Sequence, residues 1–397
     1  MSMNEDDARE LLHATAAPVS GVDLETVVRA GRRRRTRRRV AEACGGVAVI
    51  AAVAAAVTVP AAVRDHAPAT PGAADPAAVI EQAAASGASP SPVAVTCQGR
   101  ELAVPSGAQG VTVTAIDPSG RYVAGWSVHG SGSLPILWTD GVPARLDVGA
   151  PSAEIGAVNR SGAAAGVASS ADFATEWVFR YEHGHATKLN GLPGRWHYYP
   201  QAYLNDAGYV LVNAEPQGNS GGVGGVTLLW RPGSTTAEKL PLPTGTKNSA
   251  GIFGITDDNT IAGGTYADGA GRDAYVWDVQ GHGRKLDAPQ GTTAVAYAVR
   301  GDWATGGVWR AGHDGTLAVW NIRTGAVRVL PQEIGTDVNA LGAAVNRTGK
   351  VFRPDGVATL PPLAKGQSVH GAFIADTGTV VGDVSSGHTS IPAIWTC

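Results

Sequence analysis

One short pattern recurs about seven times between Thr114 and Cys397, and this repetition constrains the fold more than any other feature of the chain. Each copy joins an apolar run, an Asn/Asp-x-x-Gly turn and a small-residue run ending in Gly to an apolar triplet ending in an aromatic residue. Copies are visible in AIDPSGRYVAG with PILW, AVNRSGAAAG with WVFRY, and GITDDNTIAGG with AYVW. A chain of this kind builds one structural unit many times over.

The aromatic residues that close the copies give the period of the repeat. They stand between 32 and 49 residues apart: Trp138, Tyr181, Trp230, Trp277, Trp320, Phe352 and Trp395. Each copy holds four strand-like runs separated by turn residues, which is typical of a β-propeller blade. We therefore predict an all-β, seven-bladed propeller with the closing residues packed between blades. The abbreviated copy around Phe352 leaves a six-bladed ring open as the alternative.

The two ends of the repeat region predict how the ring closes. The last copy stops at PAIWTC without a fourth strand, and CQGRELAVPSG before the first copy resembles that missing strand. We expect this amino-terminal strand to complete the final blade. Cys97 opens the region and Cys397 ends it, so we predict a disulfide bond between them.

The amino-terminal quarter of the chain predicts a membrane anchor. Arg32–Arg39 reads RRRRTRRR and precedes the Ala/Val-rich residues 40–63, which are long enough to cross a bilayer. Because arginines mark the cytoplasmic side, we expect residues 1–39 to be a cytoplasmic stub and residues 40–63 a single transmembrane helix. Residues 64–95, rich in Ala, Pro and Ser, predict a stalk that carries the extracellular propeller, residues 96–397. A cleaved secretory signal is the alternative.

The repeats resemble those of the extracellular HAF-type repeat proteins of actinobacteria and proteobacteria, which belong with WD-like and YVTN-like propellers. Their consensus joins Ile-Asn-x-x-Gly-x-Val-Val-Gly to Ala-Phe-x-Trp-x-x-Gly, and here AVNRSGAAAG and GTVVG match the first half, AYVWDVQG and PAIW the second. The sequence departs from the pattern in lacking the His-Ala-Phe triad and in its abbreviated copy. The Arg-rich stub before an Ala/Val helix looks like that of many actinobacterial single-pass proteins. The resemblance implies a cell-surface or secreted propeller and transfers no catalytic residue.

The sequence offers no complete catalytic or metal-binding motif. Ser220 lies in GNSGG, a string similar to nucleophile motifs, but in a Gly-rich loop and not on a strand-to-helix turn. His183 and His185 form a pair that no third ligand of fixed spacing follows. We predict no catalytic residue, no metal and no cofactor. The formal net charge is -3 and the repeats carry no basic stripe, so nucleic acid is not an expected partner.

Unusual side chains gather in the loops between the second and third strands of the copies, which lie on one face of a propeller. These loops hold His129, Asp172, Arg272 and His313, and beside them the string GRWHYYPQ supplies Trp196, His197, Tyr198 and Tyr199. Aromatic groups with polar tips are common at recognition sites, so we predict a binding face here. The alternative is that WHYYP continues as the inner strand of the third blade and packs there.

These observations favour a single-pass cell-membrane protein whose propeller binds an extracellular protein, peptide or cell-wall glycan. The alternative is an extracytoplasmic lyase or hydrolase at the mouth of the propeller channel, which requires carboxylates or histidines from different blades to converge. A third hypothesis, ligand sensing across the membrane, is weaker because a lone helix transmits such signals poorly. The sequence leaves the ligand and the oligomeric state open.

Overall fold

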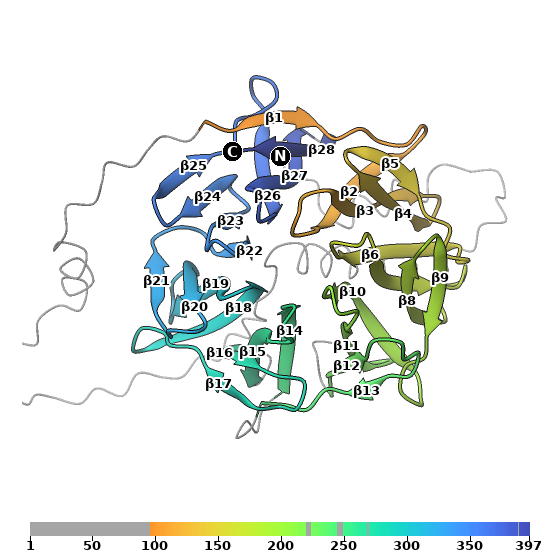
Figure 1. The fold of residues 1–397 in the computed structure, drawn as a ribbon, viewed down its shortest axis with the longest axis horizontal. Coiled ribbons are helices and arrows are strands. Elements are labelled where there is room, and N and C mark those ends of the chain that lie inside the picture. Colours follow the sequence, from red (N-terminus) through yellow and green to blue (C-terminus); the bar gives the residue numbers. More distant parts are fainter. Residues whose placement is uncertain (1–95, 220–223, 244–248, 268–269, 388) are drawn as a thin grey trace, which may run out of the picture.

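A computed structural model describes residues 96–219, 224–243, 249–267, 270–387 and 389–397. Their strands form seven four-stranded antiparallel sheets arranged as the blades of a ring (Figure 1). The fold is therefore an all-β, seven-bladed propeller. The described residues contain no helix.

The blades follow one another in chain order. The first blade consists of β2 (Gln109–Ile116), β3 (Tyr122–His129), β4 (Gly132–Thr139) and β5 (Val142–Arg145). The second consists of β6 (Ser152–Val158), β7 (Ala164–Ser169), β8 (Glu176–Glu182) and β9 (His185–Leu189). The third consists of β10 (Trp196–Leu204), β11 (Val210–Pro216), β12 (Val226–Trp230) and β13 (Glu238–Lys239). The fourth and fifth are β14 (Ser249–Ile255), β15 (Ile261–Ala267), β16 (Ala270–Trp277) and β17 (Gly283–Lys285); and β18 (Thr292–Arg300), β19 (Trp303–Arg310), β20 (Thr316–Asn321) and β21 (Val327–Leu330). The sixth is β22 (Gly335–Val338), β23 (Ala344–Asn346), β24 (Lys350–Arg353) and β25 (Gly356–Thr359). The strands of this abbreviated sixth copy are short, yet all four are present, which decides the count in favour of seven blades.

The seventh blade joins the two ends of the region, as predicted. It consists of β26 (Ser368–Ile374), β27 (Thr379–Ser386), β28 (Thr389–Thr396) and, as its outer strand, β1 (Gln98–Glu101). β1 runs antiparallel to β28 with Gln98 opposite Thr396 (Figure 1). Cys97 and Cys397 form the predicted disulfide bond. Backbone pairing and a covalent bond therefore close the ring at the same place.

The closing aromatic residues form the contacts between neighbouring blades. Trp138, Trp230, Trp320 and Trp395 are fully buried. Each indole N–H also donates a hydrogen bond to a carbonyl just beyond the outer strand of the preceding blade: Trp138 to Ala103, Trp230 to Asn190, Trp320 to Asp287 and Trp395 to Pro361. The predicted packing role is confirmed, and a repeated inter-blade hydrogen bond is added to it.

The turns between the first and second strands lie at one end of the ring, and in four blades they are Asn/Asp-x-x-Gly turns. This end is called the turn face here, and the loops between second and third strands form the opposite loop face. Gly162 and Gly208 have φ values of 79° and 88°, which glycine adopts without strain. The turn asparagines also join blades, because the amide of Asn159 donates to the carbonyl of Asn205, and that of Asn205 to the carbonyl of Thr256.

The predicted cytoplasmic stub (1–39), transmembrane helix (40–63) and stalk (64–95) lie outside the described residues. Within the described part of the chain, no helix is long and apolar enough to cross a membrane. These three segment assignments stay predictions.

Candidate binding site in the central channel

The innermost strand of every blade contains a β-bulge three or four residues before its first turn residue. The register of the innermost pair shifts once in β6, β14, β18, β22 and β26, twice in β2, and over residues 199–201 in β10. A bulge leaves one residue without a cross-strand partner and re-aims its side chain. The re-aimed residues that line the channel are Thr114, Gly156, Gln201, Phe253, Tyr297, Thr336 and Ala372. The repeat thus builds a belt of seven residues around the channel.

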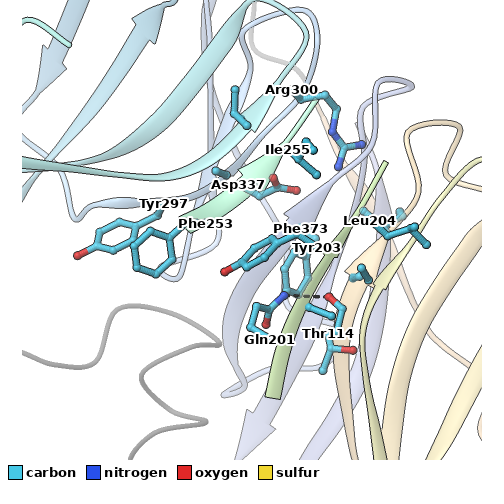
Figure 2. Close-up of a pocket in the computed structure, with 18 of the residues that line it drawn as sticks. Thr114, Gln201, Tyr203, Leu204, Phe253, Ile255, Tyr297, Arg300, Asp337 and Phe373 are labelled. Carbon is cyan, nitrogen blue, oxygen red and sulfur yellow. Dashed lines mark hydrogen bonds between the residues drawn. The ribbon is translucent and has the colours of Figure 1, made fainter. Parts of the chain in front are cut away.

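This belt surrounds a central cavity of about 150 Å³, shown in Figure 2. Such a volume holds about ten water molecules or one small organic group. Three belt side chains are hydrogen-bonded to the backbone of the adjacent blade: Thr114 donates to the carbonyl of Ile155 at 2.6 Å, Gln201 to that of Gly156 at 2.9 Å, and Thr336 to that of Ala372 at 3.0 Å. The wall of the cavity is therefore held in place before any ligand arrives.

The belt is aromatic on one side only. The rings of Phe253 and Tyr297 lie 5.1 Å apart in an edge-to-face contact, and Tyr297 makes a second one with Trp309 at 6.1 Å. On the other side stands Gly156, where an added Cβ would come within 2.3 Å of the Ala202 backbone nitrogen. Burial raises the pKa of Tyr297, so its hydroxyl stays protonated at neutral pH. The belt therefore presents an aromatic pair with a neutral polar tip, and Tyr203 and Phe373 add two further rings to the lining of the cavity (Figure 2).

The charged side chains that line the cavity are Arg300 and Asp337. Asp337 is 7% exposed, and its carboxylate accepts the backbone N–H of Ile374 at 2.9 Å. Burial raises the pKa of Asp337, while the charge of Arg300 opposes that shift. The Nη1 atom of Arg300 is buried with no hydrogen-bond partner among the described residues. Figure 2 shows both side chains beside the cavity.

An ion-pair cluster lies at the turn face of the channel. Arg160, on the second blade, contacts Asp206, Asp257 and Asp376, on the third, fourth and seventh blades, at 2.6, 2.8 and 3.0 Å. Because the guanidinium of Arg160 contacts blades on both sides of the second blade, it must lie across the end of the channel. Burial lowers the pKa of Arg160, but its hydrogen bonds and ion pairs with Asp206 and Asp257 outweigh this and raise it. The cluster therefore joins the second, third, fourth and seventh blades at the turn-face end of the channel.

The string WHYY begins β10, the inner strand of the third blade, as the packing alternative predicted. Tyr198 is 8% exposed within the core, and its pKa is raised by burial and by the nearby charge of Glu176. His197 is held by Glu176 at 2.8 Å and contacts the ring of Tyr199, and the indole of Trp196 donates to the carbonyl of Pro193. The structure places Trp196, His197 and Tyr199 at the loop-face end of β10, where their binding role stays a prediction.

The other predicted binding residues lie on the same face but are spread over four blades. His129, Arg272 and His313 are exposed, and Asp172 caps its own loop by accepting hydrogen bonds from Ser170 and Ala174. Those hydrogen bonds lower the pKa of Asp172. Within the described part of the chain, no hydrogen bond, ion pair or ring contact joins any two of the four. Among the described residues, no group of three His, Cys, Asp or Glu side chains could hold a metal ion.

The channel residues were not predicted from the sequence, because they stand out as exceptions to the repeat and not by residue type. Counted from the first turn residue, the residue two places earlier is Ala or Gly in four blades, but Tyr203 in the third, Asp337 in the sixth and Phe373 in the seventh. These exceptions are present in the sequence, but the copies can be aligned to reveal them only when the positions of the β-bulges are known.

Comparisons with known proteins support the fold alone. No protein-family model and no curated protein matches the sequence. A puromycin-hydrolyzing peptidase from Mycobacterium tuberculosis superimposes with a TM-score of 0.50 at 12% identity, covering 72% of this chain and 52% of that chain. The β-propeller domain of the Trilobed protease from Pyrococcus furiosus gives 0.48 at 11% identity, covering 72% and 95%. A putative TolB from Agrobacterium tumefaciens gives 0.39 at 15% identity, covering 56% and 80%. This chain spans about half the length of the mycobacterial peptidase.

Proposed function

We propose that this protein is a binding module that takes up part of its ligand in the central channel from the loop face. The observation that carries the proposal is the asymmetric belt. Its backbone bulge is repeated in all seven blades, whereas its side chains are aromatic only at Phe253 and Tyr297. A repeat that departs from its own pattern around a preformed cavity is typical of a recognition site. The ligand classes in question are a protein, a peptide or a cell-wall glycan.

We further propose that the propeller lies outside the cell and is anchored in the membrane by residues 40–63. We also propose that it shares a common ancestor with the HAF-type repeat proteins. The bond between Cys97 and Cys397 supports this location, because disulfide bonds persist in oxidising compartments. Protease added to intact cells should remove the propeller and leave a short membrane-bound fragment. A propeller that is degraded only after lysis would contradict the proposed orientation.

The binding proposal is tested with defined probes. The full chain would be applied to an array of random dodecapeptides and an array of cell-wall glycans, alongside its Tyr297→Ala and Trp177→Ala variants. Trp177 lies on β8, away from the cavity, and is the matched aromatic control. We expect Tyr297→Ala to lose about ten-fold in affinity, as expected for one aromatic contact, and Trp177→Ala to keep it. Equal binding by all three proteins, or no binding to either array, would contradict the proposal.

The enzyme alternative is favoured by one observation, the buried carboxylate of Asp337 at the end of the channel. Ionisable groups with shifted pKa values gather at active sites as well as in binding sites. Hydrolysis or elimination on array-positive glycans or peptides by the wild type, abolished in Asp337→Asn, would favour this alternative. Unchanged probes recovered after binding favour the binding module.

A further inference from the structure

Arg300 departs from the repeat at a position where other blades have a turn-forming side chain. The first turn residue is Asp117, Asn159, Asn205, Thr256 or Asn339 in five blades, and each accepts a backbone N–H of its own turn. The fifth blade carries Arg300 there, beside the two-residue turn of Gly301 and Asp302. Its guanidinium forms no hydrogen bond or ion pair with any described residue, and its Nη1 atom is buried. A partly buried cation without a protein partner is suited to a ligand.

Asp337 is the matching exception on the adjacent sixth blade. Counted from the turn, four blades place Ala or Gly at its position and the third and seventh blades place Tyr203 and Phe373, so the sixth blade is where this position carries a charge. Its charge is close enough to Arg300 to be influenced by it, yet the two side chains do not form an ion pair within 4 Å. Two opposite charges on one cavity wall are thus separated by a gap that a ligand could span.

We propose, on the basis of the proposed binding function, that this end of the cavity binds the zwitterionic head group of an α-amino acid. The carboxylate would pair with Arg300 and the ammonium group with Asp337. An apolar or aromatic side chain would extend toward the loop face along Phe253 and Tyr297, which lie one blade apart. The cavity volume of about 150 Å³ accommodates a group of this size.

The charges around the cavity favour a zwitterion over a simple ion. The Arg160 cluster and the cavity lining together hold two cationic groups, Arg160 and Arg300, against four anionic ones, Asp206, Asp257, Asp337 and Asp376. A carboxylate without an ammonium group would be attracted by Arg300 but repelled by the acidic excess. An amine without a carboxylate would leave Arg300 without a counter-charge. A ligand that carries both charges can pair with Arg300 and with Asp337 at the same time.

The test is isothermal titration calorimetry of the full chain with three probes of similar shape. L-phenylalanine carries both charges, 3-phenylpropionate lacks the ammonium group, and phenethylamine lacks the carboxylate. We expect L-phenylalanine to bind at least about ten-fold more tightly than either analogue, as expected for the loss of one charge-assisted pair.

Variants assign the binding to the two side chains. Arg300→Gln and Asp337→Asn should each weaken L-phenylalanine binding by about ten-fold or more, whereas Arg300→Lys should retain part of it. The matched controls are Arg310→Gln and Asp314→Asn, exposed charges on the loop face of the same blade as Arg300. Circular dichroism of each variant shows whether it is folded. If Arg300→Gln is not folded, Arg300→Lys still tests the role of Arg300.

Two results would overturn the inference. One is no binding of L-phenylalanine, L-leucine or L-tryptophan to the wild type; the other is binding that Arg300→Gln and Asp337→Asn leave unchanged. Either result leaves the binding module itself standing if Tyr297→Ala still weakens binding on the peptide or glycan array. Loss of both the array signal and amino-acid binding would remove the proposed function as well.

Discussion

Asp337 and Arg300 are the two charged residues of the cavity wall, and both replace residue types that the other blades use for packing or turn formation. In a repeat protein, a residue type that recurs in every copy has a role in the structure of each repeat. A residue that occurs in one copy alone is a candidate for a role that the whole molecule has once. The aromatic exceptions Phe253 and Tyr297 follow the same logic. The proposed binding function therefore rests on a few residues that depart from the repeat.

Asp337 also makes a prediction for stability as a function of pH. Burial raises the pKa of Asp337 above its ordinary 3.8, Arg300 opposes the shift, and Asp376 adds to it. The folded chain therefore holds this proton to higher pH than the unfolded chain, so the stability from this site falls as pH rises above 3.8. Asp337→Asn, which cannot ionise, should gain stability relative to the wild type as pH rises from about 4 to 7.

Urea unfolding of both proteins at several pH values measures this difference. Asp355→Asn, an exposed aspartate on the outer side of the sixth blade, is the control and should track the wild type. A relative stability of Asp337→Asn that falls as pH rises would show that the ionised carboxylate stabilises the fold.

At the level of strands and turns, most of the architecture could be predicted from the sequence. The turn glycines, the closing tryptophans and the missing fourth strand of the last copy each have a local physical cause that the residues themselves reveal. The bulge of each inner strand could not be predicted, because Val-Thr-Ala in β2 and Ala-Tyr-Ala in β18 continue a strand pattern without interruption. Tyr198 of the predicted binding face lies in the core, which residue type alone does not reveal.

The closing tryptophans allow a matched test of the inter-blade hydrogen bond. Trp320 donates to the Asp287 carbonyl, whereas the buried indole nitrogen of Trp277 has no partner among the described residues. Both changes to phenylalanine remove similar volume, but only Trp320→Phe leaves a carbonyl without its donor. We expect Trp320→Phe to lower the free energy of unfolding by about 1–2 kcal/mol more than Trp277→Phe. Equal losses in urea unfolding would show that packing alone holds the blades.

At the scale of the whole molecule, ring closure depends on one place. β1 contributes four residue pairs with β28, and the disulfide bond links residues 300 positions apart. Cross-linking so long a loop restricts the unfolded chain strongly, by at most about 5 kcal/mol in the entropic model. The closed ring keeps the seven belt residues at fixed distances around the cavity.

The double variant Cys97→Ser/Cys397→Ser should therefore unfold at lower urea than the wild type while keeping its β-sheet circular dichroism spectrum. Paired β1 still completes the seventh blade in that variant, so folding persists. Cys44→Ser, which leaves the bond intact, should match the wild type. Unchanged midpoints in all three proteins under oxidising conditions would mean that strand pairing alone closes the ring.

We propose that the ligand binds in the central channel and not on the outer loop face. The most direct measurement is a crystal structure of the chain with the tightest-binding probe from the peptide and glycan arrays. We predict electron density for the probe in the central cavity, in contact with Phe253 and Tyr297. Density at Trp196 and Tyr199 with an empty cavity would contradict the account and return the binding site to the face first suggested by the sequence.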